Sequence, residues 1–209
     1  MCIRDRVCSV ALGFAAALAR LSKSAVLLGV ASFYTSFFRG TPLLIQILLI
    51  YLGLPQIGLV PGAISAGIIA LSLNYGAYLS EIFRAGILGV AQGQRQAALA
   101  LGMKPSTIFW HITLPQAMRT IIPPGANQFI SMLKDSSLIS VMGVWEVMFL
   151  AQSYGRSSYR YLEMLTTAAL IYWLLSVALE LVQARLEKHY GKGFELSLIH
   201  ISEPTRRYA

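Results

Sequence analysis

The chain has 209 residues, of which 56% are hydrophobic and only 12% are charged. Together with a mean hydropathy of +0.63, this composition excludes an ordinary water-soluble domain and indicates a polytopic membrane protein with one integral domain. The net charge of +8 could suggest nucleic acid, but the basic residues form no stripe with stacking aromatics, so no nucleic-acid partner is expected. Cys2 and Cys8 predict neither a disulfide framework nor a metal site.

The two ends of the sequence look unrelated to the rest. Residues 1–6, MCIRDR, can be encoded by a string whose reverse complement, read in another frame, gives LSLIHI, which is residues 196–201. Such inverted ends are typical of a sequencing-library transposon translated by mistake, and SEPTR after Ile201 resembles adapter read-through. We therefore expect residues 1–6 and 196–209 to be adapter scars. Residues 7–195 are expected to form a single transmembrane domain whose first helix has lost its start.

Apolar stretches in the first half of the chain predict three spans. Residues 7–19 look like the end of a helix. The run 40–80 contains no charged residue over 41 positions, which is long enough for two spans of about 20 residues each. Its middle is rich in Pro and Gly and predicts a turn, which leaves spans over 41–54 and 63–79.

The second half of the chain adds two spans. Residues 120–133 and 164–179 are uncharged and predict one span each, while 136–155 predicts a short helix that lies partly in the membrane. Pro123 and Pro124 are expected to kink or interrupt the helix over 120–133. The expected fold is therefore all-α and integral to the membrane, with about five transmembrane helices.

Loop charges predict the orientation through the positive-inside rule. If the loop after the first span, the central loop and the C-terminal segment share one side, that side carries Arg20, Lys23, Arg39, Arg84, Arg95, Lys104, Arg119, Arg185, Lys188 and Lys192. The other side carries only Lys134, Arg156 and Arg160. Ten against three places the central loop and the C-terminus in the cytoplasm and, with five spans, the N-terminus outside.

The central loop has a distinctive pattern, QAALALGMKPSTIFWHITLP, over residues 96–115. Its first six residues are strong helix formers, and Gly102 can adopt the left-handed conformation that ends a helix. Pro105 suits the first turn of a second helix. That helix should end near Leu114, because Pro115 disfavours helical geometry in the residue before it. The segment therefore predicts two short helices joined by a bend.

This pattern resembles the EAA loop of ABC-importer permeases, written Glu-Ala-Ala, three residues, Gly, nine residues, Ile-x-Leu-Pro. The residues in register with it are Ala97, Ala98, Gly102, Ile112, Leu114 and Pro115, while Gln96 stands where the pattern prefers Glu. Elsewhere, FRGTPLLIQ (38–46), YLSEIFRAGI (78–87), GQRQAALALGM (93–103), LPQAMR (114–119) and LKDSSL (133–138) resemble permease subunits of polar amino-acid ABC importers of the His/Gln/Glu/Arg type. The likeness covers nearly all of residues 7–195.

The resemblance implies a type I ABC-importer permease fold and a multi-pass subunit of the bacterial inner membrane that moves polar amino acids by alternating access. It implies four partners: a cytoplasmic ABC ATPase, an extracytoplasmic amino-acid-binding protein, a second permease copy or paralogue, and membrane lipid. Because the chain contains no G-x-x-x-x-G-K-[ST] phosphate loop, ATP and Mg are expected on the partner ATPase, with no cofactor, metal or enzymatic activity here.

The resemblance also assigns roles to residues. Coupling to the ATPase is expected of Gln96, Ala97, Ala98, Gly102, Ile112, Leu114 and Pro115, because a short rigid helix seated in a partner groove can transmit a displacement. Polar groups within apolar stretches are candidates for the translocation path; these are Asn74, Asn127, Gln128, Lys134, Asp135 and Ser136. Hydrogen bonding between helices is the alternative role for the amides. Two local charge pairs are also expected, Lys134 with Asp135 and Glu81 with Arg84.

Three alternatives remain open at this point. A permease for another solute, such as methionine or an anion, would share the loop but should lack FRGTPLL and LKDSSL. An autonomous secondary carrier or channel would need paired half-helices or an ionisable relay within this one chain. A membrane anchor without a transport role would leave the loop pattern unexplained.

Overall fold

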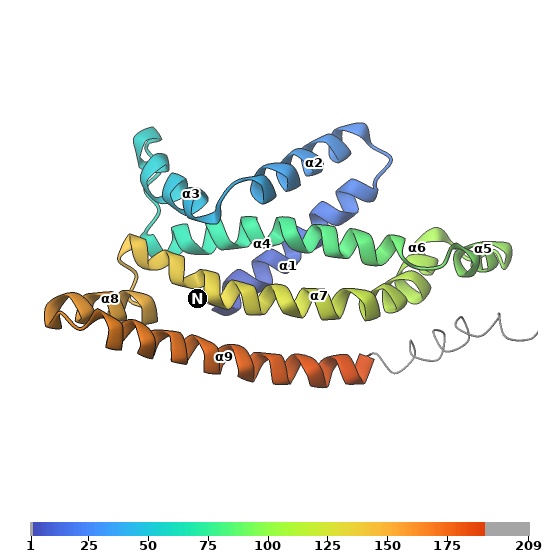
Figure 1. The fold of residues 1–209 in the computed structure, drawn as a ribbon. Coiled ribbons are helices and arrows are strands. Elements are labelled where there is room, and N and C mark those ends of the chain that lie inside the picture. Colours follow the sequence, from blue (N-terminus) through green and yellow to red (C-terminus); the bar gives the residue numbers. More distant parts are fainter. Residues whose placement is uncertain (1, 191–209) are drawn as a thin grey trace, which may run out of the picture.

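The computed structural model describes residues 2–190 and shows helices and no strand in that range (Figure 1). In chain order the elements are α1 (Cys2–Leu21), α2 (Ala25–Gly40), α3 (Leu43–Leu48), the π-helical η1 (Leu49–Gly53), the 3₁₀-helical η2 (Leu54–Ile57), α4 (Ala63–Leu88), α5 (Gln92–Ala100), α6 (Pro105–Ile108), the π-helical η3 (Phe109–Thr113), α7 (Leu114–Asp135), the 3₁₀-helical η4 (Ser136–Met142), α8 (Val147–Ser158) and α9 (Tyr161–Tyr190).

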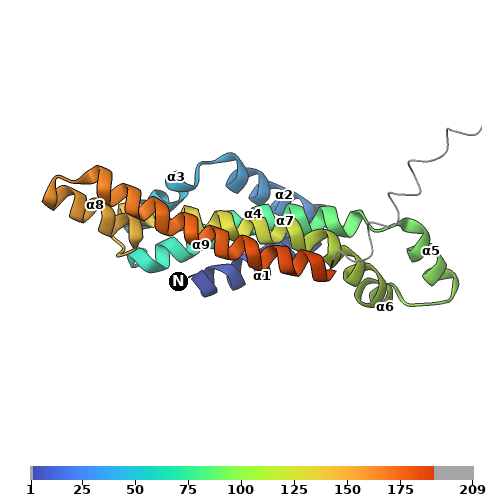
Figure 2. The same ribbon diagram turned by 60° about the horizontal axis from the view of Figure 1, so that its bottom comes forward.

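Helix α4 is the centre of the fold. It is buried along most of its length, α1 crosses it, and α7 runs beside it in both views (Figures 1 and 2). Small residues permit this packing: a Cβ on Gly13 of α1 would lie 2.8 Å from the Cβ of Leu79 and 3.0 Å from the carbonyl oxygen of Gly76. Helix α9, in contrast, exposes most of its apolar side chains, as expected of a helix whose apolar partners are lipid or another chain.

Two helices, α4 and the stretch Tyr161–Lys188 of α9, are long and apolar enough to cross a membrane. The number rises to four if each of two bent helix pairs counts as one crossing. This is fewer than the five spans expected. The expected first span lies in α1, whose opening turns contain Arg4, Asp5 and Arg6, and so α1 is not among these candidates.

Helix α2 was missed by the sequence prediction, and the span expected over 41–54 is not a single straight helix. Instead α2 and the segment Leu43–Ile57 form one of the bent pairs, with an angle of 107° between them. Pro42 accounts for the break, because it forces the preceding residue out of helical geometry; Thr41 is extended at φ −113°, ψ 142°. Arg39, counted above as a loop charge, therefore lies in the last turn of a helix.

Helix α7 runs continuously through Pro123 and Pro124, so of the two expected effects of these prolines, a kink or an interruption, the interruption does not occur. Neighbouring helices in a membrane protein commonly stabilise a helix at such prolines, and α7 packs against both α4 and α9. After α7 the chain turns through η4 into α8, so two helices stand where one short helix over 136–155 was expected, and the second ends at Ser158. The other expected spans prove longer than predicted, since 63–79 extends to Leu88 and 164–179 lies inside α9.

The structure describes residues 2–6 of the first expected scar and no residue of the second. Helix α1 begins at Cys2 and thus includes residues 2–6. Residues 196–209 lie outside the described range.

Candidate functional site

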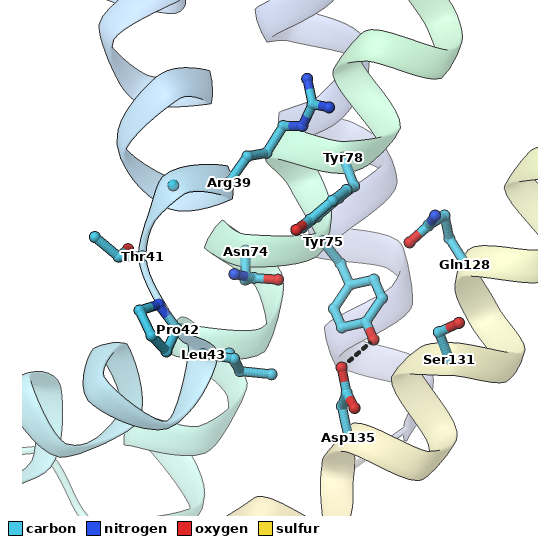
Figure 3. Close-up of a pocket in the computed structure, with 11 residues that line it drawn as sticks. Arg39, Thr41, Pro42, Leu43, Asn74, Tyr75, Tyr78, Gln128, Ser131 and Asp135 are labelled. Carbon is cyan, nitrogen blue, oxygen red and sulfur yellow. Dashed lines mark hydrogen bonds between the residues drawn. The ribbon is translucent and has the colours of Figure 1, made fainter.

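A polar pocket of about 440 Å³ opens where the break between α2 and α3 meets α4 and α7 (Figure 3). Its lining is dominated by hydrogen-bonding side chains and consists of Arg39, Gly40, Thr41, Pro42, Leu43, Asn74, Tyr75, Tyr78, Gln128, Ser131 and Asp135. Of the residues predicted for the translocation path, Asn74, Gln128 and Asp135 are brought together here. A polar cavity of this size between apolar helices is an expected form for a small-molecule site.

The helix break is held by side-chain amides. Ending α2 at Gly40 leaves backbone carbonyls without helical partners, and in an apolar environment such groups need others. Gln46 Nε2 donates to the carbonyl oxygens of Phe38 at 2.9 Å and Thr41 at 3.0 Å. Asn74 Nδ2 donates to the same Phe38 oxygen at 3.0 Å and to Gln46 Oε1 at 3.1 Å. Asn74 therefore lines the pocket and also bonds between helices.

Opposite charges lie at the two ends of the pocket. Figure 3 shows Arg39 and Asp135 at opposite ends of the lining, with Tyr75 and Tyr78 between them. Asp135 Oδ2 accepts a hydrogen bond of 2.6 Å from the Tyr75 hydroxyl. The expected pair with Lys134 is not among the ion pairs of residues 2–190; consecutive residues of a helix point in different directions, and Lys134 is exposed.

Three path candidates, Asn127, Lys134 and Ser136, lie outside the pocket lining. Asn127 accepts a hydrogen bond of 2.9 Å from Gln183 of α9, which is the interhelical role left open above. Ser136 donates to the Leu133 carbonyl oxygen at 2.6 Å, a local bond at the end of α7.

Sequence reasoning missed five polar residues of the lining, which are Arg39, Thr41, Tyr75, Tyr78 and Ser131. Helical spacing could have found two of them. Tyr78 is four residues after Asn74, and Ser131 lies between Gln128 and Asp135 at intervals of three and four, so each shares a helix face with a residue already selected.

An ionic cluster adjoins the pocket at Glu81. The expected pair with Arg84 is confirmed, since Glu81 Oε1 accepts from Arg84 Nε at 3.2 Å and Nη2 at 2.5 Å. Arg20 of α1 also donates to Glu81 Oε2, and Arg39 of α2 approaches the same oxygen at 3.8 Å. One carboxylate thus connects three helices.

The coupling segment, residues 92–115, protrudes beyond one end of α4 and α7 (Figures 1 and 2). Gly102 has φ of +75°, which confirms the left-handed stop, and Pro105 opens α6 as expected. A hydrogen bond from Gln116 of α7 to Gln94 ties α5 back to the helices. The segment is therefore an ordered projection with its own internal contacts.

The expected end near Leu114 is wrong, because helical geometry continues from α6 through η3 into α7. Leu114 itself has φ −63° and ψ −46°, and Pro115 occupies the first turn of α7. A π-helical turn shifts the hydrogen-bond register, and the first turn of a helix tolerates a proline because its amide has no partner to lose there.

Exposure divides the coupling residues into two groups. Gln96, Ala97, Gly102 and Pro115 are exposed, and Ile112 and Leu114 are half-buried. Ala98, in contrast, is only 4% exposed, where α5 meets α6 and η3. Leu99 and Leu101 beside it are 49% and 82% exposed. The apolar surface that this segment offers to another molecule is therefore leucine-rich and excludes Ala98.

Comparison with known proteins finds a matching family and similar permease proteins. The family described as "Binding-protein-dependent transport system inner membrane component" matches residues 9–192. The arginine transport system permease protein ArtQ of Bacillus subtilis (strain 168) is 40% identical over 178 residues, covering 85% of this chain and 81% of that protein. The L-cystine transport system permease protein TcyB of the same organism is 42% identical over 177 residues, covering 84% and 76%.

A solved structure, described as the crystal structure of an amino acid ABC transporter with histidines, matches with a TM-score of 0.85 and 37% identity over 90% of this chain and 88% of that one. The sequence and structural matches agree, and the chain belongs to the family of binding-protein-dependent transport system inner membrane components.

Proposed function

We propose that the pocket between α2, α4 and α7 binds a polar amino acid on its way across the membrane. Membership of the family makes the chain a multi-pass permease subunit of an inner-membrane ABC importer, which is a transport component and not an ATP-hydrolysing enzyme. What we propose beyond family membership is the substrate, the orientation of the helices across the membrane and the individual partners.

The charge distribution of the pocket is the observation that carries this proposal. A zwitterionic amino acid presents a carboxylate and an ammonium group. Arg39 lines the pocket and lies 3.8 Å from Glu81, beyond hydrogen-bond distance, so its guanidinium can donate to a carboxylate. Asp135 has one oxygen engaged by Tyr75 and offers the other to an ammonium group. Relatives named for arginine and cystine transport support the same substrate class.

The coupling segment is proposed to dock on a cytoplasmic ABC ATPase. Exposed apolar side chains at the end of a protein mark a contact surface, and Leu99, Leu101 and Trp110 are 49%, 82% and 56% exposed. The ATPase would bind ATP and Mg, so that this chain needs no cofactor of its own. An extracytoplasmic amino-acid-binding protein and a second permease copy or paralogue complete the proposed importer.

We place the N-terminus outside and the C-terminus in the cytoplasm. The coupling segment and the C-terminal end of α9 lie toward the same end of the molecule, while η2 and α8 lie at the other (Figure 1). This arrangement agrees with the loop-charge argument, which needs the central loop and the C-terminal segment on one side.

ATP-driven uptake by the assembled importer tests the proposal. The permease, its ATPase and its binding protein are reconstituted in proteoliposomes and supplied with labelled arginine, histidine, glutamine and cystine. Uptake of at least one amino acid, dependent on both ATP and binding protein, is expected. Absence of uptake for all of them, with a complex shown to be assembled, contradicts the function.

Leu101→Asp tests the docking surface, because a charge on an exposed apolar contact opposes burial in a partner. The variant should lose ATPase in co-purification and should lose uptake. Tyr159→Asp, a 91% exposed residue between α8 and α9, is the matched control and should retain the ATPase. Full retention by Leu101→Asp would show that the docking surface is assigned wrongly. Ala98→Asp is unsuitable, because Ala98 is buried within the chain itself.

A further inference from the structure

The carboxylate of Glu81 is surrounded by arginines from three helices. Arg20 at the end of α1 donates to Oε2, and Arg84, one turn along α4, donates twice to Oε1. Arg39 Nη1, in the last turn of α2, lies 3.8 Å from Oε2. Three cations thus face one carboxylate, and the cluster keeps an excess of positive charge at the edge of the pocket.

Arg39 is the loosely held member of this cluster. Its distance to Glu81 exceeds that of a hydrogen bond, and both carboxylate oxygens already have closer partners. The Arg39 side chain is 42% exposed, against 18% for Arg20 and 32% for Arg84. Its guanidinium carbon lies 5.4 Å from the ring centre of Tyr78, and both residues line the pocket (Figure 3).

We propose that Glu81 is a positioning residue that holds Arg39 at the edge of the pocket, and that the carboxylate of the bound amino acid competes with Glu81 for this arginine. The inference rests on the proposed function, because it requires a ligand with a carboxylate. Arg20 and Arg84 remain on Glu81 when Arg39 turns away, so the cluster loses only its weakest ion pair. Ligand binding therefore releases an attraction between α2 and α4.

Competition predicts an effect of opposite sign to that of a purely structural role. If Glu81 only joined the helices, Glu81→Gln would weaken ligand binding. Under competition it frees Arg39 and tightens the binding of a carboxylate, by about two- to fivefold for a half-exposed ion pair. Arg84→Gln should have the reverse effect, because it vacates Glu81 Oε1 and lets Glu81 hold Arg39 more strongly.

The test measures ligand binding to the purified permease–ATPase complex without the binding protein. Labelled L-arginine and L-histidine are the carboxylate-bearing probes, and agmatine and histamine are the same molecules without the carboxylate. Glu81→Gln, Arg39→Gln and the double variant form a cycle. Glu81→Gln should tighten arginine or histidine two- to fivefold only when Arg39 is present, and should leave agmatine and histamine unchanged.

Glu163→Gln is the matched control. Glu163 pairs with Arg160 at 3.0 Å, with the same three-residue spacing as Glu81 and Arg84, but on exposed α9. Its substitution should alter neither kind of probe. If Glu163→Gln changed probe binding as much as Glu81→Gln does, the effect would come from the general loss of a negative charge.

Three results overturn the competition: tightening that persists in the Arg39→Gln background, tightening that extends to the decarboxylated probes, or weaker binding by Glu81→Gln. If Glu81→Gln does not assemble, Arg84→Gln decides the matter, and unchanged binding of the carboxylate-bearing probes overturns the inference. Uptake by the wild-type protein distinguishes failure of the competition from failure of the proposed function. Normal amino-acid uptake combined with any of these results removes only the competition, whereas absent uptake removes the proposed function.

Discussion

At the scale of single residues, carboxylates such as Glu81 and Glu146 join neighbouring helices. Glu146 precedes α8 and accepts backbone hydrogen bonds from Met148 at 2.8 Å and Phe149 at 2.7 Å. The same carboxylate accepts from the Tyr172 hydroxyl of α9 at 2.6 Å. One side chain therefore caps one helix and attaches it to the next, which matters because η4 and α8 follow directly on the pocket residue Asp135.

Replacing Glu146 by Ala should destabilise the protein by about 1–2 kcal/mol, because it removes a helix cap and one partner of Tyr172. The midpoint of heat-induced aggregation in detergent should fall measurably. Glu146→Gln keeps an acceptor oxygen, so its aggregation midpoint should lie between those of Glu146→Ala and the wild type. The control is Glu163→Ala, which loses only an exposed ion pair; an equal loss in both variants would contradict the capping role.

Asp135→Asn tests the other end of the pocket. The amide oxygen can still accept from Tyr75, but the negative charge proposed to meet the ammonium group is gone. A charge-assisted hydrogen bond is worth enough to raise KM for uptake by about tenfold or more. Asp135→Glu should recover part of the affinity. Unchanged KM in Asp135→Asn would mean that the ammonium group is bound elsewhere.

The same scale shows what can be read from sequence. Asp135 and Gln128 stood out because polar groups in apolar helices need a reason to be there. Arg39 did not, because it follows a long apolar stretch and was counted as a loop charge. The packing of α2 against α4 brings Arg39 beside α4, and a fold-level contact of this kind leaves no local mark in the sequence.

At the scale of elements, composition indicated helices but not how they bend. The missed α2 has an uncharged stretch of its own. Because the charge-free run after it is longer, the predicted span over 41–54 began at the 107° break and left α2 out. The coupling segment was predicted better, because Gly102 and Pro105 act on their immediate neighbours. Its burial pattern was not, since which alanine faces inward depends on where η3 folds back.

Gly13→Ala should disturb the crossing of α1 and α4. The new methyl group would meet the Leu79 Cβ at 2.8 Å and the Gly76 carbonyl oxygen at 3.0 Å, so that the helices must separate. Overpacking of this kind costs about 1–3 kcal/mol. Gly29→Ala on α2 is the control, because no atom lies within 4 Å of its added Cβ. Yield and aggregation temperature should fall for Gly13→Ala alone; equal behaviour would contradict the close approach.

At the scale of the whole molecule, orientation rests on an imbalance of loop charges. Gln56 in η2 and Lys104 before α6 are both exposed. The segments that hold them, η2 and the bend between α5 and α6, lie toward opposite ends of the protein (Figure 1). Their side chains can therefore report which end faces the cytoplasm.

In a Cys2→Ser, Cys8→Ser background, Gln56→Cys should react with a membrane-impermeant thiol reagent added to intact spheroplasts. Lys104→Cys should react only after the membrane is opened. Detergent-solubilised samples, in which both sites are accessible, provide the control for intrinsic reactivity. Labelling of Lys104→Cys in intact spheroplasts would reverse the proposed orientation and move the coupling segment away from any cytoplasmic ATPase.

The break between α2 and α3 has a mechanical consequence. Sharp bends in membrane helices invite interpretation as hinges, but here Phe38, Gln46 and Asn74 close a ring of hydrogen bonds, and each of the three takes part in two of them. Opening the bend would strip several of these bonds at once where water is scarce. The corner should therefore travel with α4 as one rigid block, so that the flexing required for alternating access takes place elsewhere in the permease.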